Sequence, residues 1–325
     1  VVDCSAKDSS VVEELARVAE LCMRCIFAGQ IQLYLATGGD SFVKVFDKPV
    51  RFSNDTLLQA SHRLLRQTEK ENAKGKSAIN LEAVLKQIVE EPATQVPHGS
   101  YQDIIIIKYA TTRLDNQEHT QAYANNMCGA PGSNIRLFSL LVDPKHALGE
   151  DQSSEDEFLS AICRAANGSM LKLPNASKGL AVINEVMNHA MSSSASKLSV
   201  DCHTTKPHTL VPSDLPTLFF GDRLLAFMLF DSSDVAVKSV TVKCDSIFHA
   251  EALTTTNIRE TKHTAIIKHA AKRRIEELQS QVQRHPDNKA QLSQEIEELS
   301  LHHQIVAHTT AITMQDQPPA VPVAP

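Results

Sequence analysis

Two short stretches have residue types and spacings that could do chemistry. Gly75-Lys76-Ser77 matches the end of a phosphate-binding loop, and Cys22 and Cys25 have the two-residue separation of a redox pair. The loop lacks the glycine expected five residues earlier, where Lys70 stands, and it follows a helical pattern where the motif needs a strand. Both cysteines lie inside a predicted helix, away from its N-terminus, so we expect buried packing. No nucleotide site and no redox site is predicted.

Histidines near the C-terminal end could supply nitrogen ligands if two predicted helices pair. They are His263, His269, His302, His303 and His308. No cysteine or carboxylate completes a known ligand spacing, so solvated helix faces and ordinary packing are favoured. No serine, cysteine or histidine has the local context of a known catalytic motif, and the chain is therefore predicted not to be an enzyme. No cofactor is expected.

Composition and charge limit the classes of partner. The chain has 325 residues, and the net charge of -6 gives no general reason to expect nucleic acid. No apolar run approaches the ~20 residues that span a bilayer, so no membrane span is predicted. Seven cysteines without a framework of short spacings favour the cytoplasm. Glycosylation patterns at Asn54, Asn167 and Asn175 leave a secreted protein as the alternative. Because the chain opens at Val1 within a predicted strand, we expect a piece of a longer protein.

Residues 1–193 alternate between strand and helix patterns, which predicts an α/β fold with a mostly parallel, doubly wound sheet. The expected order is a strand, a helix, two strands, two helices and then three strand–helix pairs. Helices are predicted at 11–27, 55–71, 77–91, 116–128, 155–166 and 180–191, and strands at 31–36, 42–46, 103–110, 135–142 and 170–173. Four consecutive isoleucines from Ile104 predict a central strand that is covered on both faces.

The pattern changes at about Ser194, where short strand patterns and prolines replace the helices. Residues 194–314 are predicted to form a smaller module, β-sandwich-like with two C-terminal helices. Its strands are expected at 209–211, 217–220, 224–230 and 235–242, and its helices at 265–283 and 291–302. Basic residues of the first helix and acidic residues of the second predict that the helices pair. Residues 315–325 hold four prolines and form a Pro-rich tail.

The opening stretch, with Asp3, Ser5 and Lys7, resembles the first motif of a von Willebrand factor A domain, Asp-x-Ser-x-Ser. Three later stretches resemble the region after that domain in inter-alpha-trypsin inhibitor heavy chains and their intracellular relatives. These are LPTLFFGDRLLAFMLF at 215–230, IIKHAAKRRIEEL at 266–278 and LSLHHQIVAHTTAI at 299–312. In that family a β-rich VIT domain usually precedes the A domain, which would place it before Val1.

The resemblance implies a divalent cation bound by an Asp, two Ser, a Thr and a distant Asp, with one coordination position open to an acidic partner. Asp3 and Ser5 match the first two positions, but Lys7 replaces the second serine. Ser77 would replace the threonine, and Tyr109 stands where the distant aspartate is expected. Lysines beside the remaining ligands would repel a dication. The implied metal site is thus degenerate, and no metal ligands are predicted.

Two other interpretations of Asp3 and Ser5 are open. Asp3 could pair with Lys7 or Lys76, which would replace a metal site by an internal salt bridge. Asp3 and Ser5 could instead cap the first helix, since both residue types are favoured at a helix N-terminus.

Three functions follow from these observations. We favour a non-enzymatic protein-interaction or scaffold module that needs no metal, with a protein partner and possible membership of a larger assembly. The first alternative is cation-dependent adhesion through Asp3, Ser5 and Ser77. The second is a docking region of a larger enzyme, as in the vault-associated ADP-ribosyltransferase that shares this domain combination.

Overall fold

The structure is a computed structural model, and it describes residues 1–6, 8–26, 29–71, 78–90, 101–129, 134–144, 154–204, 206–230, 236–245, 250–256, 264–284 and 288–307. Two units are distinguished along the chain. The first comprises Val1–Lys197, Pro216–Asp222 and Cys244–Glu251, and the second comprises Leu198–Leu215, Arg223–Lys243 and Ala252–Pro325.

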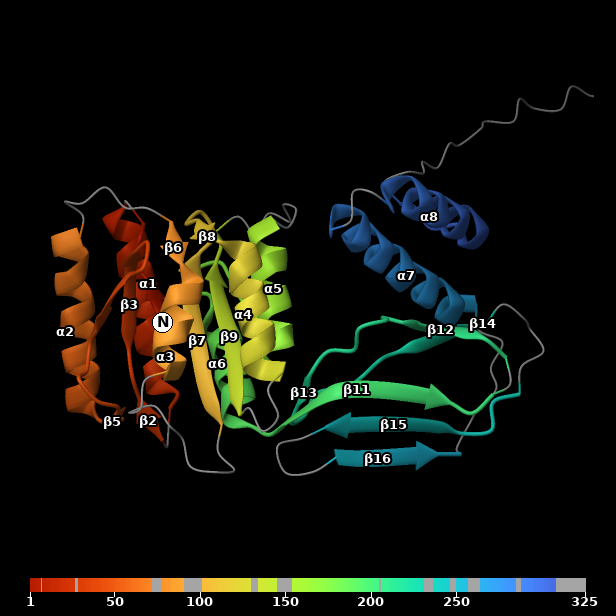
Figure 1. Cartoon of the computed structure of the whole chain (residues 1–325), viewed down its shortest axis with the longest axis horizontal. Coiled ribbons are helices and arrows are strands. Elements are labelled where there is room, and N and C mark those ends of the chain that lie inside the picture. The colour runs from red at the N-terminus through yellow and green to blue at the C-terminus, as the bar shows by residue number, and fades with distance from the viewer. Residues whose placement is uncertain are drawn as a thin grey trace, which may run out of the picture. The chain divides into compact units, whose positions relative to one another are not determined.

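A six-stranded sheet forms the centre of the first unit (Figure 1), with the order β10-β9-β7-β1-β3-β4. Its strands are β1 (Val2–Asp3), β3 (Tyr34–Gly38), β4 (Ser41–Lys44), β7 (Gln102–Tyr109), β9 (Ile135–Val142) and β10 (Met170–Leu173). All neighbours are parallel except β3 and β4, which form an antiparallel hairpin. The predicted α/β class with one hairpin in a mostly parallel sheet is confirmed.

Six helices flank this sheet: α1 (Ser9–Arg24), α2 (Asn54–Glu71), α3 (Leu81–Glu90), α4 (Gln117–Gly129), α5 (Ser154–Ala165) and α6 (Leu180–Met191). Two short pairs also lie in this unit. They are antiparallel β2 (Gln30–Ile31) with β5 (Val50–Arg51) and parallel β6 (Ile79–Asn80) with β8 (Leu114–Asp115). The predicted order of helices and main strands along residues 1–191 is confirmed, with ends that shift by a few residues.

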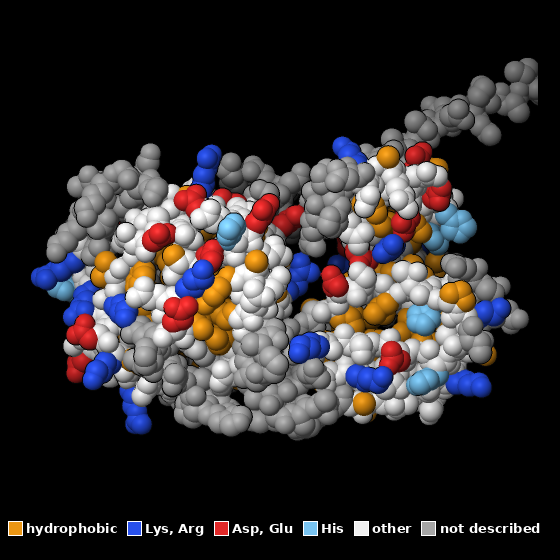
Figure 2. All heavy atoms as spheres, viewed as in Figure 1, with side chains coloured by type: hydrophobic (Ala, Val, Ile, Leu, Met, Phe, Trp, Pro, Cys, Tyr) orange, Lys and Arg blue, Asp and Glu red, His pale blue; other side chains and the backbone are white. Residues whose placement is uncertain are grey.

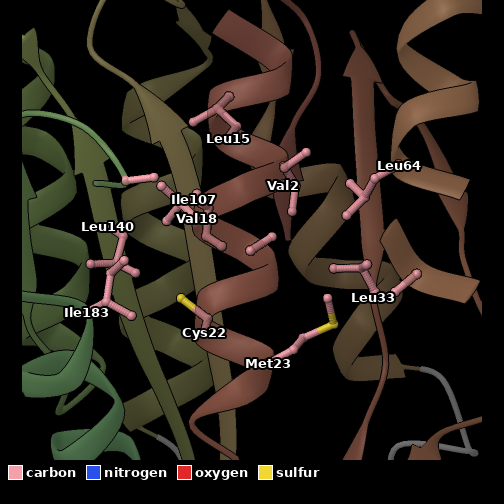
Figure 3. Close-up of a cluster of buried hydrophobic side chains, with 14 of the residues drawn as sticks. Val2, Leu15, Val18, Cys22, Met23, Leu33, Leu64, Ile107, Leu140 and Ile183 are labelled. Carbon is pink, nitrogen blue, oxygen red and sulfur yellow. The ribbon is translucent and has the colours of Figure 1, made fainter. Parts of the chain in front are cut away.

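The central strands bury side chains on both faces, because successive strand residues point in opposite directions. In β7, Ile107 contributes to a core cluster with α1, α2 and α6, whereas Ile104 and Ile106 contribute to a second cluster with α3, α4 and α5. Figure 3 shows the first cluster, in which Leu15 and Ile183 meet the strand side chains. Helices therefore cover both faces of the sheet.

Glycines permit the sharp turns that connect these elements. Gly38 and Gly39, at the turn from β3 to β4, have φ angles of 122° and 56°, which other residues adopt only with strain. After α5, the left-handed position is taken by Asn167 with a φ of 53°. Gly168 is needed for a different reason, since a Cβ at this position would lie 1.9 Å from the carbonyl oxygen of Leu137.

The buried face of α2 differs from the predicted one. In the sequence, the helical pattern at 55–71 is carried by Leu57, Leu58, His62 and Leu65. In the structure Leu58 is 67% exposed, and the buried positions are Leu57, Ala60 and Leu64. Both sets have helical spacing, so periodicity alone could not select between two adjacent faces.

The second unit contains β12 (His208–Val211) paired antiparallel with β14 (Phe227–Phe230), and most of β11 (Ser194–Cys202), β15 (Val240–Asp245) and β16 (Ala250–Thr255). The sequence patterns missed β11 and β16. The predicted helices are confirmed as α7 (Thr264–Arg284) and α8 (Lys289–His303), and they pair around Ile275, Leu278 and Ile296. Arg274 donates to Glu295 across this pair at 2.8 and 3.1 Å, which confirms part of the expected charge pairing. Arg273 instead pairs within α7, with Glu276.

Candidate functional site

The carboxyl ends of β1 and β7 bring two of the predicted site residues to one edge of the sheet. Asp3 ends β1, Tyr109 ends β7, and the two parallel strands are neighbours, with Val2 opposite Ile107. Ligands of open α/β sheets bind at this edge. Lys7 and Ser77 lie outside the described residues, as does Lys76, so the proposed pairing of Asp3 with a lysine there stays a prediction.

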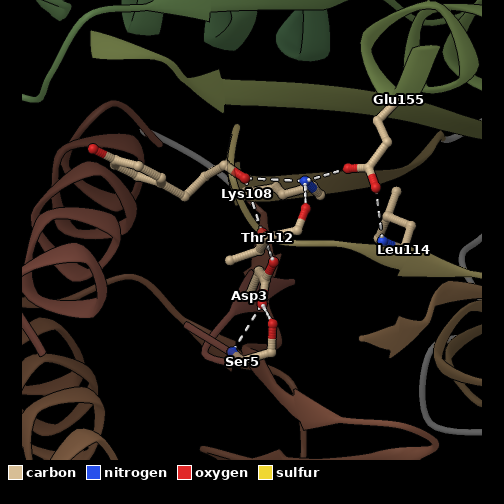
Figure 4. A network of polar contacts seen from close by, with 7 residues as sticks. Asp3, Ser5, Lys108, Thr112, Leu114 and Glu155 are labelled. Carbon is tan, nitrogen blue, oxygen red and sulfur yellow. Dashed lines mark hydrogen bonds and ion pairs between the residues drawn. The ribbon is translucent and has the colours of Figure 1, made fainter. Parts of the chain in front are cut away.

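Asp3 is buried and bound by hydroxyl and amide groups (Figure 4). Its Oδ1 accepts hydrogen bonds from the Ser5 amide at 2.9 Å and the Ser5 hydroxyl at 2.7 Å, and its Oδ2 contacts the Thr112 hydroxyl. The interpretation of Asp3 and Ser5 as the cap of the first helix is wrong. Asp8 caps α1 by accepting from the Ser10 amide, because the helix begins four residues after Ser5, at Ser9.

Lys108 is a buried cation at the same edge. Its side chain is 1% exposed, and Nζ donates to the carbonyl oxygens of Tyr109, at 3.0 Å, and Thr112, and to Glu155 Oε2 at 3.1 Å. An ammonium group has three hydrogens, so these three acceptors use all of them. Thr112 is bound through its carbonyl to Lys108 and through its hydroxyl to Asp3, which joins both charges in one network (Figure 4).

The first turn of α5 supplies the carboxylates that neutralise the lysines of this edge. Glu155 binds Lys108 and also accepts from the Leu114 amide at 3.4 Å. The next residue, Asp156, forms a buried ion pair of 2.5 Å with Lys172 of β10. Carboxylates are favoured at a helix N-terminus by the helix dipole, so the same residues stabilise α5 and the two lysines.

Tyr109, at the expected aspartate position, packs against the α1 side of the core instead of joining the polar network through its hydroxyl. Burial raises the pKa of Tyr109, and the nearby carboxylates of Glu14, Asp143 and Asp8 raise it further. Its backbone oxygen does take part, since it accepts from Lys108 and lies 2.8 Å from the Thr112 hydroxyl, whose single hydrogen it shares with Asp3.

Sequence reasoning missed three members of the network, Lys108, Thr112 and Glu155. A usable signal was present, because a lysine that directly follows four isoleucines of a central strand must find a partner. The partner itself could not be inferred, since Glu155 lies 47 residues away along the chain.

The donor groups that the structure describes do not fit the divalent cation that the sequence resemblance implies. Among the described residues, Asp3 is the carboxylate that contacts Ser5 and Thr112, and its oxygens already accept hydrogen bonds from their hydroxyls. A fixed ammonium group, held by the carbonyl of Thr112, repels a dication nearby. Among the described residues, no group of three or more His, Cys, Asp or Glu side chains could hold a metal ion.

The other candidates from the sequence have structural roles. Cys22 is buried in the core (Figure 3), and this burial raises the pKa of its thiol to about 12. Cys25 is half-buried and donates to Asn184 Oδ1 at 3.3 Å. Of the five histidines near the C-terminal end, His263 and His308 lie outside the described residues. His302 and His303 contact each other with ring centroids 4.6 Å apart.

Ser169, His189 and Asp222 also meet, near the amino ends of the strands, although no sequence pattern connected them. His189 Nδ1 lies 3.3 Å from the Ser169 hydroxyl, and Nε2 lies 3.8 Å from Asp222. The imidazole stacks on Phe219 at 4.2 Å, and Asp222 accepts from the Phe219 amide. None of these three residues lines the cavities of about 430 and 280 Å³ described in this unit. We therefore interpret the three residues as structural contacts that hold β13 (Leu218–Phe219) in place, where it pairs with the start of β11.

Comparison with known proteins identifies the fold. No protein-family model and no curated protein matches the chain. A solved von Willebrand factor type A protein from Catenulispora acidiphila aligns with a TM-score of 0.51 and 12% identity, over 93% of this chain and 78% of that one. A human COPII-coat protein gives 0.44 with 13% identity, covering 93% and 50%. The pilus adhesin SpaC of Lactobacillus rhamnosus GG gives 0.35 with 11% identity, covering 80% and 42%. The fold assignment rests on the first alignment and confirms the predicted von Willebrand A fold.

Proposed function

We propose that this chain is a non-enzymatic protein-interaction module that holds its partner without a metal ion. The observation that supports this most directly is the network of Lys108, Thr112 and Asp3 at the carboxyl edge of the sheet. In a metal-dependent A domain, a cation at this edge offers an open position to an acidic partner. Lys108 has no hydrogen left to donate and is 1% exposed, so a partner carboxylate has no equivalent group to bind.

The partner surface that we propose lies where α1 faces the loop after β10. A cavity of about 430 Å³ is lined there by Glu14, Arg17, Asn175 and Ser177, among others. Glu14 accepts from the amide of Ala176, and Arg17, which pairs with Glu14 at 3.7 Å, is 67% exposed to a partner. The opposite face of this unit, which carries α3 and α4, is the one seen in Figure 2, and its acidic and basic side chains are interspersed, so that face does not favour a polyanion.

A relationship to the inter-alpha-trypsin inhibitor heavy-chain type, with a VIT domain before this chain, is part of the proposal. It rests on the sequence stretches at 215–230, 266–278 and 299–312. The cysteine pattern favours the cytoplasm as the compartment. Among the described residues, no helix has the length and apolar character to cross a bilayer. Docking within a larger enzyme, such as a vault-type ADP-ribosyltransferase, is an extension of the same function.

Metal independence is tested by two measurements on the same protein. Titration calorimetry with Mg²⁺ and Mn²⁺ is expected to show no saturable binding. Affinity purification of the full-length protein should recover the same partner with and without EDTA, and Arg17→Glu should reduce its recovery. Arg66→Glu, an exposed change on α2, is the control and should leave recovery unchanged.

Cation-dependent adhesion is the second candidate, favoured by the convergence of the Asp3 carboxylate with two hydroxyl groups. These are ligand types that Mg²⁺ accepts. Saturable micromolar Mg²⁺ binding, together with loss of the partner in EDTA, would establish this candidate and overturn the proposal.

A further inference from the structure

The strand β16 ends a sheet on one side. In the order β13-β11-β15-β16 its only strand neighbour among the described residues is β15, and the two arrows run in opposite directions (Figure 1). The Thr241 and Thr254 hydroxyls, 2.9 Å apart, fix this pairing on one face of the sheet. Alternate N–H and C=O groups along the other edge of β16 therefore point away from the sheet, as a template for another strand.

The described residues of β16 have few of the sequence features that usually block strand pairing. Residues 252–256 are all exposed, and Leu253 is 74% exposed. Proteins protect such edges with lysine, proline or inward-pointing charges. β16 reads Ala-Glu-Ala-Leu-Thr-Thr, so its one charge is Glu251 and it has neither lysine nor proline.

We propose that β16 pairs antiparallel with β16 of a second copy of this chain, around a two-fold axis at Leu253. Self-pairing is favoured by the order of the residues. In this register Leu253 lies opposite Leu253 of the second copy and Ala252 lies opposite Thr254, so the exposed leucines meet, and position 251, which holds the one charged residue of the strand, is not opposite its own copy. A two-fold interface requires this kind of self-complementary surface.

The contact is small, which sets the expected strength. A stable, specific interface buries about 1,200 Å² or more in total, and two six-residue strands supply only part of that. The expected association is therefore weak, reversible and dependent on concentration. It is independent of the proposed partner surface on α1.

Sedimentation velocity and light scattering on the whole chain, from low micromolar to near-millimolar concentration, test the proposal. The unaltered chain should shift reversibly from monomer toward dimer. Leu253→Lys and Leu253→Glu should each remain monomeric, because two like charges then face each other. An equimolar mixture of these two variants should associate again, because Lys and Glu then face each other. Leu58→Lys is the matched control, since Leu58 is 67% exposed on α2, and it should associate like the unaltered chain.

Three results would overturn the proposal. The unaltered chain could stay monomeric at all concentrations, Leu253→Lys could associate as well as Leu58→Lys, or the mixture could fail to associate. Circular dichroism of each variant shows whether the fold is retained, and the exposure of Leu253 means that its replacement removes little packing.

Discussion

Lys108 places a positive charge inside the core, and its removal should reveal how much of the sheet edge depends on it. Lys108→Met keeps the length of the side chain but leaves Glu155 without its cation, removes the lysine donor of the Thr112 carbonyl and takes one of two donors from the Tyr109 carbonyl. Breaking a buried ion pair in this way costs several kcal/mol, and the 20% exposure of Glu155 reduces that cost. We expect the free energy of unfolding, measured in urea, to fall by about 2–4 kcal/mol.

Lys86→Met is the matched control for this change. Lys86 is 47% exposed and pairs with Glu82 one helical turn away, so its replacement should alter stability little. The double variant Lys108→Met/Glu155→Gln should recover part of the loss. Equal unfolding curves for Lys108→Met and Lys86→Met would contradict the role assigned to Lys108.

Cys22 should be chemically inert in the folded chain. With a pKa raised to about 12, its thiol stays protonated at pH 8, and burial keeps reagents away. A thiol reagent at pH 8, followed by mass spectrometry, should label Cys25 before Cys22, and urea should make both reactive. Rapid labelling of native Cys22 would contradict this assignment.

The same pKa predicts a pH dependence of stability. Since the folded value of about 12 exceeds the ordinary 9.0, the unfolded chain loses this proton first as pH rises. The contribution of Cys22 to the free energy of unfolding is therefore constant below about pH 9 and falls between the two values.

At the scale of elements, Arg136 ties β9 to β7 and to the end of α6. Its guanidinium binds both oxygens of Asp103, at 2.7 and 3.0 Å, and the carbonyl of Ser192 at 2.7 Å. The ring of Tyr101 lies 3.6 Å from it. Burial raises the pKa of Asp103, and Arg136 opposes that change.

Arg136→Lys should be costly although it keeps the charge, because an ammonium cannot replace a two-armed planar contact. We expect a loss of about 2–4 kcal/mol in the free energy of unfolding, read from denaturant curves. Arg24→Lys, at an exposed pair with Glu20, should change little. Similar unfolding curves for Arg136→Lys and Arg24→Lys would show that the two-armed contact of Arg136 with Asp103 is not needed for stability.

Helix faces show what limited prediction at this scale. For α1 the apolar residues at helical spacing in the sequence include Val12, Leu15, Val18 and Cys22, which are all buried, because one apolar stripe dominates that helix. In α2 two adjacent stripes compete, and contact with the sheet selects the one that contains Leu64. The edge strand β16 was missed for a related reason, since a strand exposed on both faces has no alternation of apolar and polar residues to detect.

For the whole molecule, the sequence by itself determined the class and order of the first unit. Continuous β-branched strands and amphipathic helices are local patterns, and a doubly covered parallel sheet is the arrangement that buries both. The sequence also determined that Tyr109 stands where an aspartate was expected.

Only the tertiary structure decided what occupies that edge. Thr112 binds Asp3 across 109 residues of sequence, and Glu155 binds Lys108 across 47 residues. Sheet pairing and the placement of α5 bring them together, so the ion pair depends on the fold as a whole. A charge buried in the core requires a partner, but sequence alone does not say which one, because any of many carboxylates could satisfy it.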